Sequence, residues 1–94
     1  MYISNEIKHK INKYKAKGGK TNRERVIYRI NTFLNFCKKN GKTTPHEIGK
    51  KDVYQFFNKN KNLKNTTKRD YYYAIRALWL HVLNRPNDPP YPFF

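Results

Sequence analysis

The sequence predicts an all-α protein, and three observations support this prediction. Apolar residues recur every three or four positions in four separate stretches, which is the spacing of one face of a helix. Capping or breaking residues bound these stretches, among them Thr21, Gly41 and Asn65. The longest stretch, Asn65 to Leu83, is followed by no glycine or proline until Pro86 and contains none itself. Together these features favour one small domain built from helices.

The stretch from Asn65 to Leu83 is predicted to be the central helix, capped by Asn65 and Thr66. One apolar stripe along it consists of Tyr71, Ile75, Leu78 and Val82, with Trp79 beside them. A neighbouring stripe consists of Arg69, Tyr72, Tyr73 and Arg76. Cations with aromatic rings between them on one face suit a phosphate backbone and the bases beneath it. Beyond Arg76 the helix is apolar almost all round, so we expect a basic first half and a buried second half.

The 94-residue chain has a formal charge of +15, from 21 lysines and arginines against 6 acidic residues. A compact chain with this charge repels itself, so a polyanionic partner is expected. Nucleic acid is the first candidate and an anionic membrane surface is the second. The alternative explanation of the positive charge is an AT-rich genome, which favours lysine, asparagine and isoleucine codons without any link to function. The arginines at structured positions argue for a function instead.

The lone cysteine, Cys37, excludes an internal disulfide, and its position on an apolar helix face predicts a buried structural thiol. The three histidines, His9, His46 and His81, are too widely spaced for a zinc site. No metal, cofactor or catalytic residue is therefore predicted. Because no signal peptide or 18-residue apolar span is found, we expect a cytoplasmic protein.

Residues 1–17 are predicted to form an amphipathic basic helix, whose apolar side consists of Ile3, Ile7, Ile11 and Tyr14. Such a helix can lie on a membrane surface. We prefer packing against the rest of the chain, because this side has only four sizeable apolar residues and the core needs a cover.

A second helix is predicted from Thr21 to about Asn40. Thr21 and Glu24 form a capping box at its start, and Gly41 supplies the stop. Its core stripe consists of Val26, Ile30, Phe33 and Cys37, widened by Ile27 and Leu34. One edge of that stripe consists of Asn22, Arg25, Arg29 and Thr32. We interpret Thr32 as an ordinary solvated residue, and Arg25 and Arg29 as DNA contacts near a helix N-terminus that attracts phosphate.

A short third helix is predicted to begin at Asp52 and end near Asn60, with Val53, Phe56 and Phe57 facing the core. After Leu83 the chain changes character, because the prolines of residues 84–94 exclude regular helix or strand. We interpret residues 86–94 as an extended proline-rich linker or docking arm, and residues 1–85 as the domain. The two final phenylalanines suggest that a further domain follows or that the tail packs on something.

The order and spacing of these elements resemble the N-terminal core-binding domain, also called SAM-like, of tyrosine recombinases and phage-type integrases. The resemblance covers nearly the whole chain. The matching residues are Thr21, Tyr28, Ile30, Phe33, Phe36, Gly41, Ile48, Asp52, Val53, Phe56, Thr66, Thr67, Ala74, Ile75, Arg76, Leu78 and Trp79, with residues 87–90 as the exit. It implies a four-helix SAM-like orthogonal bundle that forms half of a C-shaped clamp on double-stranded DNA.

In that family the second and fourth helices address the major groove. Carried onto matching positions, the resemblance implies these DNA-binding residues: Lys20, Thr21, Asn22, Arg25, Arg29, Thr66, Thr67, Lys68, Arg69, Tyr73 and Arg76. Neighbouring recombinase subunits and a C-terminal catalytic domain are the further partners it implies. The family's catalytic arginines, His-x-x-Arg box and tyrosine nucleophile belong to that second domain, so this chain is expected to have no catalysis of its own.

The leading hypothesis is therefore duplex DNA binding as the core-binding domain of a tyrosine-type recombinase or integrase, nucleoid-associated when bound. The first alternative is a free-standing small DNA-binding regulator or accessory protein derived from such a domain. A membrane-surface or protein-interaction module built on residues 1–17 ranks lower, as does RNA binding. No small-molecule substrate is predicted.

Overall fold

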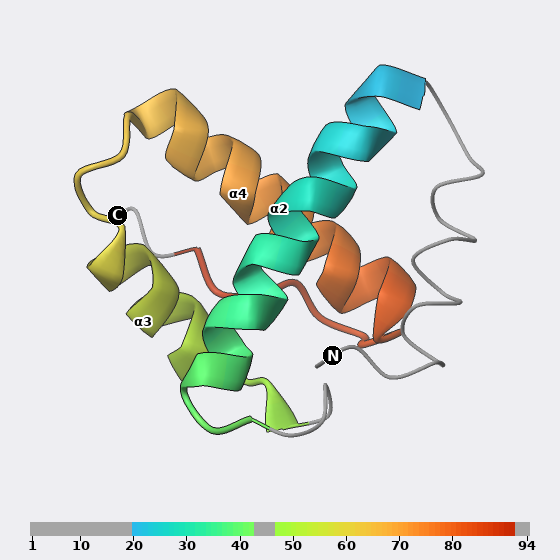
Figure 1. The fold of residues 1–94 in the computed structure, drawn as a ribbon. Coiled ribbons are helices and arrows are strands. Elements are labelled where there is room, and N and C mark those ends of the chain that lie inside the picture. Colours follow the sequence, from blue (N-terminus) through green and yellow to red (C-terminus); the bar gives the residue numbers. More distant parts are fainter. Residues whose placement is uncertain (1–19, 43–46, 92–94) are drawn as a thin grey trace.

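The computed structural model describes residues 20–42 and 47–91. Side chains are described from Glu24 onward. The predicted helix at residues 1–17 and the loop residue His46 lie outside the described residues. The described residues are mostly helical and contain no strand (Figure 1). The predicted all-α class is confirmed for this part of the chain.

Helix α2 spans Lys20–Lys39. It begins one residue before the predicted cap, so Thr21 lies inside the first turn rather than before it. The first turn of a helix lacks partners for its N–H groups, and helix starts therefore move by a residue or two at little cost. The predicted stop is confirmed, because Gly41 has a φ of +91°. The Gly41 N–H donates to Lys38 O and the Lys42 N–H donates to Cys37 O, which together satisfy two carbonyls at the end of the helix.

Helix α3 spans Lys50–Lys59 and starts two residues earlier than predicted. Asp52 is the third residue of the helix, and its Oδ2 accepts a 2.7 Å hydrogen bond from the Gly49 N–H, which precedes the helix. The Asp52 side chain is buried and lies 3.7 Å from Lys42 Nζ. Asp52 therefore fixes the start of α3 from within its first turn.

Helix α4 spans Asn65–Ala77 and continues into η2, a π-helical turn at Leu78–Val82. Lys64 is the residue before the helix, so Asn65 and Thr66 lie in its first turn instead of capping it. The predicted helix thus has nearly its predicted extent, but its last turn widens, and the Leu83 N–H donates to Leu78 O. Asn84 ends it with a φ of 53°.

The core lies where α2 crosses α4, with α3 beside the C-terminal half of α2 (Figure 1). Its buried side chains are Ile30, Phe33, Leu34, Cys37, Ile48, Val53, Phe56, Phe57, Tyr72, Ala74, Ile75, Leu78, Trp79 and Val82. The Phe56 ring is central, because the rings of Phe33, Phe36, Phe57 and Tyr71 lie 5.3–5.4 Å from it, the first three edge to face. The predicted core stripes of all three helices are confirmed, although Val26, Ile27 and Tyr71 are only half-buried.

Residues 84–91 form no regular helix or strand and run antiparallel to α4 (Figure 1). The Tyr72 hydroxyl donates a 2.9 Å hydrogen bond to Pro89 O, and the Tyr72 ring meets the Tyr91 ring edge to face at 4.9 Å. Tyr72 is therefore buried, and its predicted place on the exposed basic stripe is wrong. The sequence spacing put Tyr72 on that stripe, but a segment seventeen residues later covers it.

Arg85 connects this segment to the rest of the fold. Its guanidinium lies 4.1 Å from the centroid of the Trp79 ring and donates a 2.5 Å hydrogen bond to Ile48 O. Burial lowers the pKa of Arg85, and the nearby Asp52 carboxylate acts in the opposite direction.

In the described residues no helix combines the length and the apolar character needed to cross a membrane.

Candidate nucleic-acid interface

A groove runs between the first halves of α2 and α4, and we call it the α2–α4 groove. Its volume is about 440 Å³, and its lining residues are Glu24, Arg25, Tyr28, Arg29, Thr67 and Tyr71. Three of the predicted DNA-binding residues, Arg25, Arg29 and Thr67, are therefore brought together here. Thr67 lies more than 35 positions after the two arginines, and the crossing of the two helices unites them.

Arg29 is the most firmly positioned cation of the α2–α4 groove. One terminal nitrogen of its guanidinium lies 3.7 Å from Asp70 Oδ2, and the guanidinium lies 5.9 Å from the centroid of the Tyr71 ring. Its side chain is 25% exposed. The distance to Asp70 is longer than a hydrogen bond, so the ion pair is weak and leaves donors of the guanidinium available.

Arg25 lies one helical turn before Arg29 and is exposed. No ion pair joins Arg25 to an acidic side chain among the residues whose side chains are described. Two arginines one turn apart on the wall of a groove can hold one anion or two successive ones, since each guanidinium offers five N–H donors.

The first five residues of α4 include four of the predicted DNA-binding residues: Thr66, Thr67, Lys68 and Arg69. Only Thr67 lines the α2–α4 groove. Thr66 and Arg69 are exposed and Lys68 is half-buried. Helix N-termini attract phosphate through their unpaired N–H groups, so these residues add charge and hydroxyl donors to a suitable backbone.

Three further predicted residues, Lys20, Thr21 and Asn22, lie in the first turn of α2, and their side chains are outside the described part. Tyr73 and Arg76 lie beyond the groove on α4. Tyr73 is 56% exposed, as the basic stripe predicts. Arg76 is exposed too, but its Nε–H donates a 3.1 Å hydrogen bond to Asp88 Oδ1, so the segment after the helix partly neutralises it.

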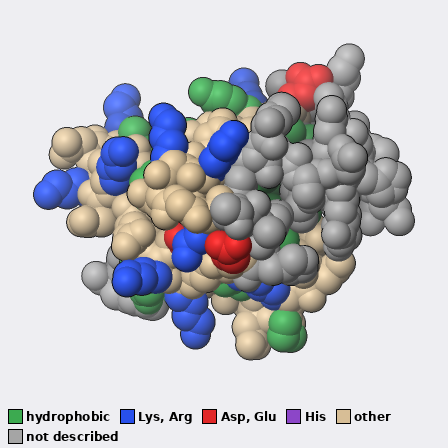
Figure 2. All heavy atoms as spheres, turned by 60° about the horizontal axis from the view of Figure 1, so that its bottom comes forward, with side chains coloured by type: hydrophobic (Ala, Val, Ile, Leu, Met, Phe, Trp, Pro, Cys, Tyr) green, Lys and Arg blue, Asp and Glu red, His purple; other side chains and the backbone are tan. Residues whose placement is uncertain are grey.

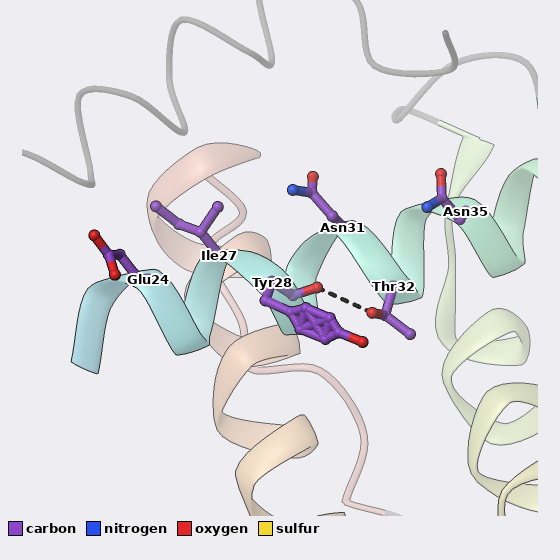
Figure 3. Close-up of a pocket in the computed structure, with 6 residues that line it drawn as sticks. All are labelled: Glu24, Ile27, Tyr28, Asn31, Thr32 and Asn35. Atoms are coloured by element: carbon purple, nitrogen blue, oxygen red, sulfur yellow. Dashed lines mark hydrogen bonds between the residues drawn. The ribbon is translucent and has the colours of Figure 1, made fainter. Parts of the chain in front are cut away.

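Tyr28 belongs to this surface, although we did not single it out as a binding residue from the sequence. It is 62% exposed, and with Glu24 it lines both the α2–α4 groove and a second groove of about 480 Å³ along α2 (Figure 3). The other lining residues of the second groove are Ile27, Asn31, Thr32 and Asn35. The spacing of Glu24, Arg25, Tyr28 and Arg29, which are one turn apart in pairs, is the signal that could have revealed this surface.

Thr32 was interpreted from the sequence as an ordinary solvated residue rather than as a DNA contact. Its Oγ1 donates a 3.0 Å hydrogen bond to the backbone oxygen of Tyr28, one turn earlier (Figure 3). Figure 3 also shows that the Tyr28 ring points away from Asn31 and Asn35. Tyr28, Asn31 and Asn35 nevertheless line the same groove, since Tyr28 and Asn35 lie about two turns apart on one side of α2.

Positive charge is not limited to the groove. On the face shown in Figure 2, Lys and Arg side chains are spread across the described surface, and few acidic side chains lie among them.

In the part of the chain that the structure describes, no cluster of three or more His, Cys, Asp or Glu side chains could hold a metal ion. Cys37 is fully buried, and this burial, reinforced by Asp52, raises the pKa of its thiol to about 12, so it is not a nucleophile at neutral pH.

The chemistry of the groove is thus that of an anion site with aromatic walls. Arginine guanidinium groups supply positive charge, Thr67 supplies a hydroxyl, and Tyr28 and Tyr71 supply ring surface. Comparison of the chain with known proteins finds no matching family model, no matching curated protein and no matching solved structure.

Proposed function

We propose that this chain binds double-stranded DNA, in the manner of the core-binding domain of a tyrosine-type recombinase or integrase. The observation that carries the proposal is the α2–α4 groove, where Arg25 and Arg29 of one helix meet Thr67 of another on a chain of net charge +15. Nucleic-acid binding at physiological salt depends largely on cations that replace the counterions of phosphates.

In this proposal some residues of α2 and α4 contact phosphates and others on α4 contact bases. Arg25, Arg29, Thr67 and Lys68 hold phosphates and set the orientation of the domain on the duplex. Arg69 and Tyr73 lie exposed on α4 and reach base edges, where a bidentate arginine contact to guanine is worth about 1–3 kcal/mol. Arg76 joins them only after it leaves Asp88.

The first experiment measures duplex affinity of the full chain against salt concentration. With some four to eight phosphates neutralised, log K should fall against log salt with a slope of about −4 to −7. An affinity that does not change with salt, or no binding at low salt, would end the proposal.

The second experiment compares two double variants that remove the same charge. The variant Arg25→Ala/Arg29→Ala removes both arginines from the wall of the α2–α4 groove. The variant Lys50→Ala/Lys51→Ala removes two exposed lysines from the first turn of α3. We expect the arginine variant to lower affinity more than about tenfold and the lysine variant less than about threefold. Circular dichroism on both variants separates lost binding from lost folding. Equal losses would indicate a diffuse electrostatic surface and would remove the groove from the proposal.

A further inference from the structure

Tyr28 is a large, solvent-exposed aromatic side chain next to two arginines, Arg25 and Arg29. It is 62% exposed and projects from the middle of α2, a regular helix. Because it lines two grooves at once, it stands as a ridge between them. Arg25 and Arg29 lie next to it on the α2–α4 groove side.

A fully paired duplex makes little use of such a ring. Base pairs present only their edges in the grooves, and their faces are covered by stacking. An unpaired base exposes its faces, and proteins that bind single strands combine exposed aromatic rings with arginines that hold the backbone. The groove contains both kinds of group, because Arg25, Arg29, Tyr28 and Tyr71 all line it.

We propose that the α2–α4 groove binds one unpaired nucleotide, with its base stacked on Tyr28 and its phosphate held by Arg25 and Arg29. This inference rests on the proposed function, since the same arginines serve both. It adds a ligand that duplex binding does not need, such as a base extruded from a bulge or a strand opened within the duplex. The volume of about 440 Å³ is open enough for one nucleotide to enter from solvent.

Glu24 sets the orientation of that nucleotide. Its carboxylate lines the same groove and repels phosphate, so the phosphate lies toward the arginines and the base toward Glu24 and Tyr28. A carboxylate also accepts hydrogen bonds from the amino group of cytosine. Glu24 therefore favours bases that carry a hydrogen-bond donor on their edge, and an unpaired cytidine is the best probe.

The test uses the full chain and three fluorescent probes of one sequence: a paired duplex, the same duplex with one unpaired cytidine, and the single strand. We expect the bulged duplex to bind about tenfold more tightly than the paired duplex, within the range of base–aromatic stacking. Tyr28→Ala should reduce that ratio to near one. Tyr28→Phe should keep it, because stacking needs the ring and not the hydroxyl. Tyr54→Ala removes a 50% exposed tyrosine of α3 and should also keep it.

Equal affinity of the native chain for the bulged and paired duplexes would overturn the inference, as would a Tyr28→Ala variant that retains the native ratio. The two proposals fail separately. If the paired duplex does not bind at low salt while the single strand binds in a Tyr28-dependent way, duplex recognition is wrong and the nucleotide site stands.

Discussion

The Nε–H of Arg76 donates a 3.1 Å hydrogen bond to Oδ1 of Asp88, twelve residues further along the chain. This contact joins the exposed face of α4 to the segment that returns along it. Both side chains are about half exposed, so the ion pair is weak and can open. In the proposed complex Asp88 competes with DNA for Arg76.

The first prediction follows from this competition. Asp88→Asn should raise duplex affinity about two- to threefold at low salt, since it releases Arg76 and removes one negative charge. In an Arg76→Ala background the same substitution should raise affinity less. Fluorescence anisotropy on the four proteins of this cycle gives the coupling between the two residues. The same gain in both backgrounds would mean that Asp88 acts only through its charge.

Trp79 is predicted to be structural. Its ring is 5% exposed in the core, and Trp79→Ala should cost roughly 3–5 kcal/mol of unfolding free energy by opening a large cavity. Urea denaturation followed by circular dichroism measures this loss, with the exposed Tyr54→Ala as the control expected within about 0.5 kcal/mol of the native chain. An unchanged midpoint for Trp79→Ala would contradict the packing of α4 described above.

Arg85 should contribute to stability through geometry as well as charge. Arg85→Ala loses the hydrogen bond to Ile48 O and the contact with the Trp79 face, and we expect a cost of about 1.5–3 kcal/mol. Arg85→Lys keeps the charge but lacks the planar fork, so it should recover only part of this loss. Urea midpoints for the three proteins decide the matter. Full recovery by lysine would show that charge alone is enough.

The buried thiol of Cys37 predicts a specific alkaline weakening. Its pKa rises from 9.0 to about 12 in the folded chain, because burial disfavours the thiolate. The stability that this shift contributes is complete below pH 9 and is lost between pH 9 and 12, since the unfolded chain releases the proton first. From pH 8 to 10.5 the native chain should therefore lose about 2 kcal/mol more than Cys37→Ala.

The measurement is urea denaturation at both pH values under reducing conditions. The two proteins differ only at residue 37, so the difference between their declines isolates the thiol. The same decline in the native chain and in Cys37→Ala would show that the Cys37 site is solvated in the native state.

Much of the fold could be predicted from the sequence, because helix periodicity is a local property. The spacing of Ile30, Phe33 and Cys37 predicted a buried face, and all three are fully buried. Helix starts were less accurate. Asp52 was expected to begin a helix, yet it lies in the first turn and accepts a hydrogen bond from the Gly49 N–H, because aspartate can stabilise a helix start both as the cap and as the third residue.

For the candidate site too, some features could be predicted from the sequence and others depend on the tertiary structure. By itself the sequence determined that the chain is basic, mostly helical in its described part, and carries arginines on helix edges, since charge and periodicity are written along the chain. Only the tertiary structure decided that Arg29 and Thr67 share a groove, that Tyr72 is covered and that Arg76 is paired with Asp88. Each of these depends on contacts between segments distant in sequence. Their geometry is fixed by how the helices cross and where the chain returns, which no local pattern of residues encodes.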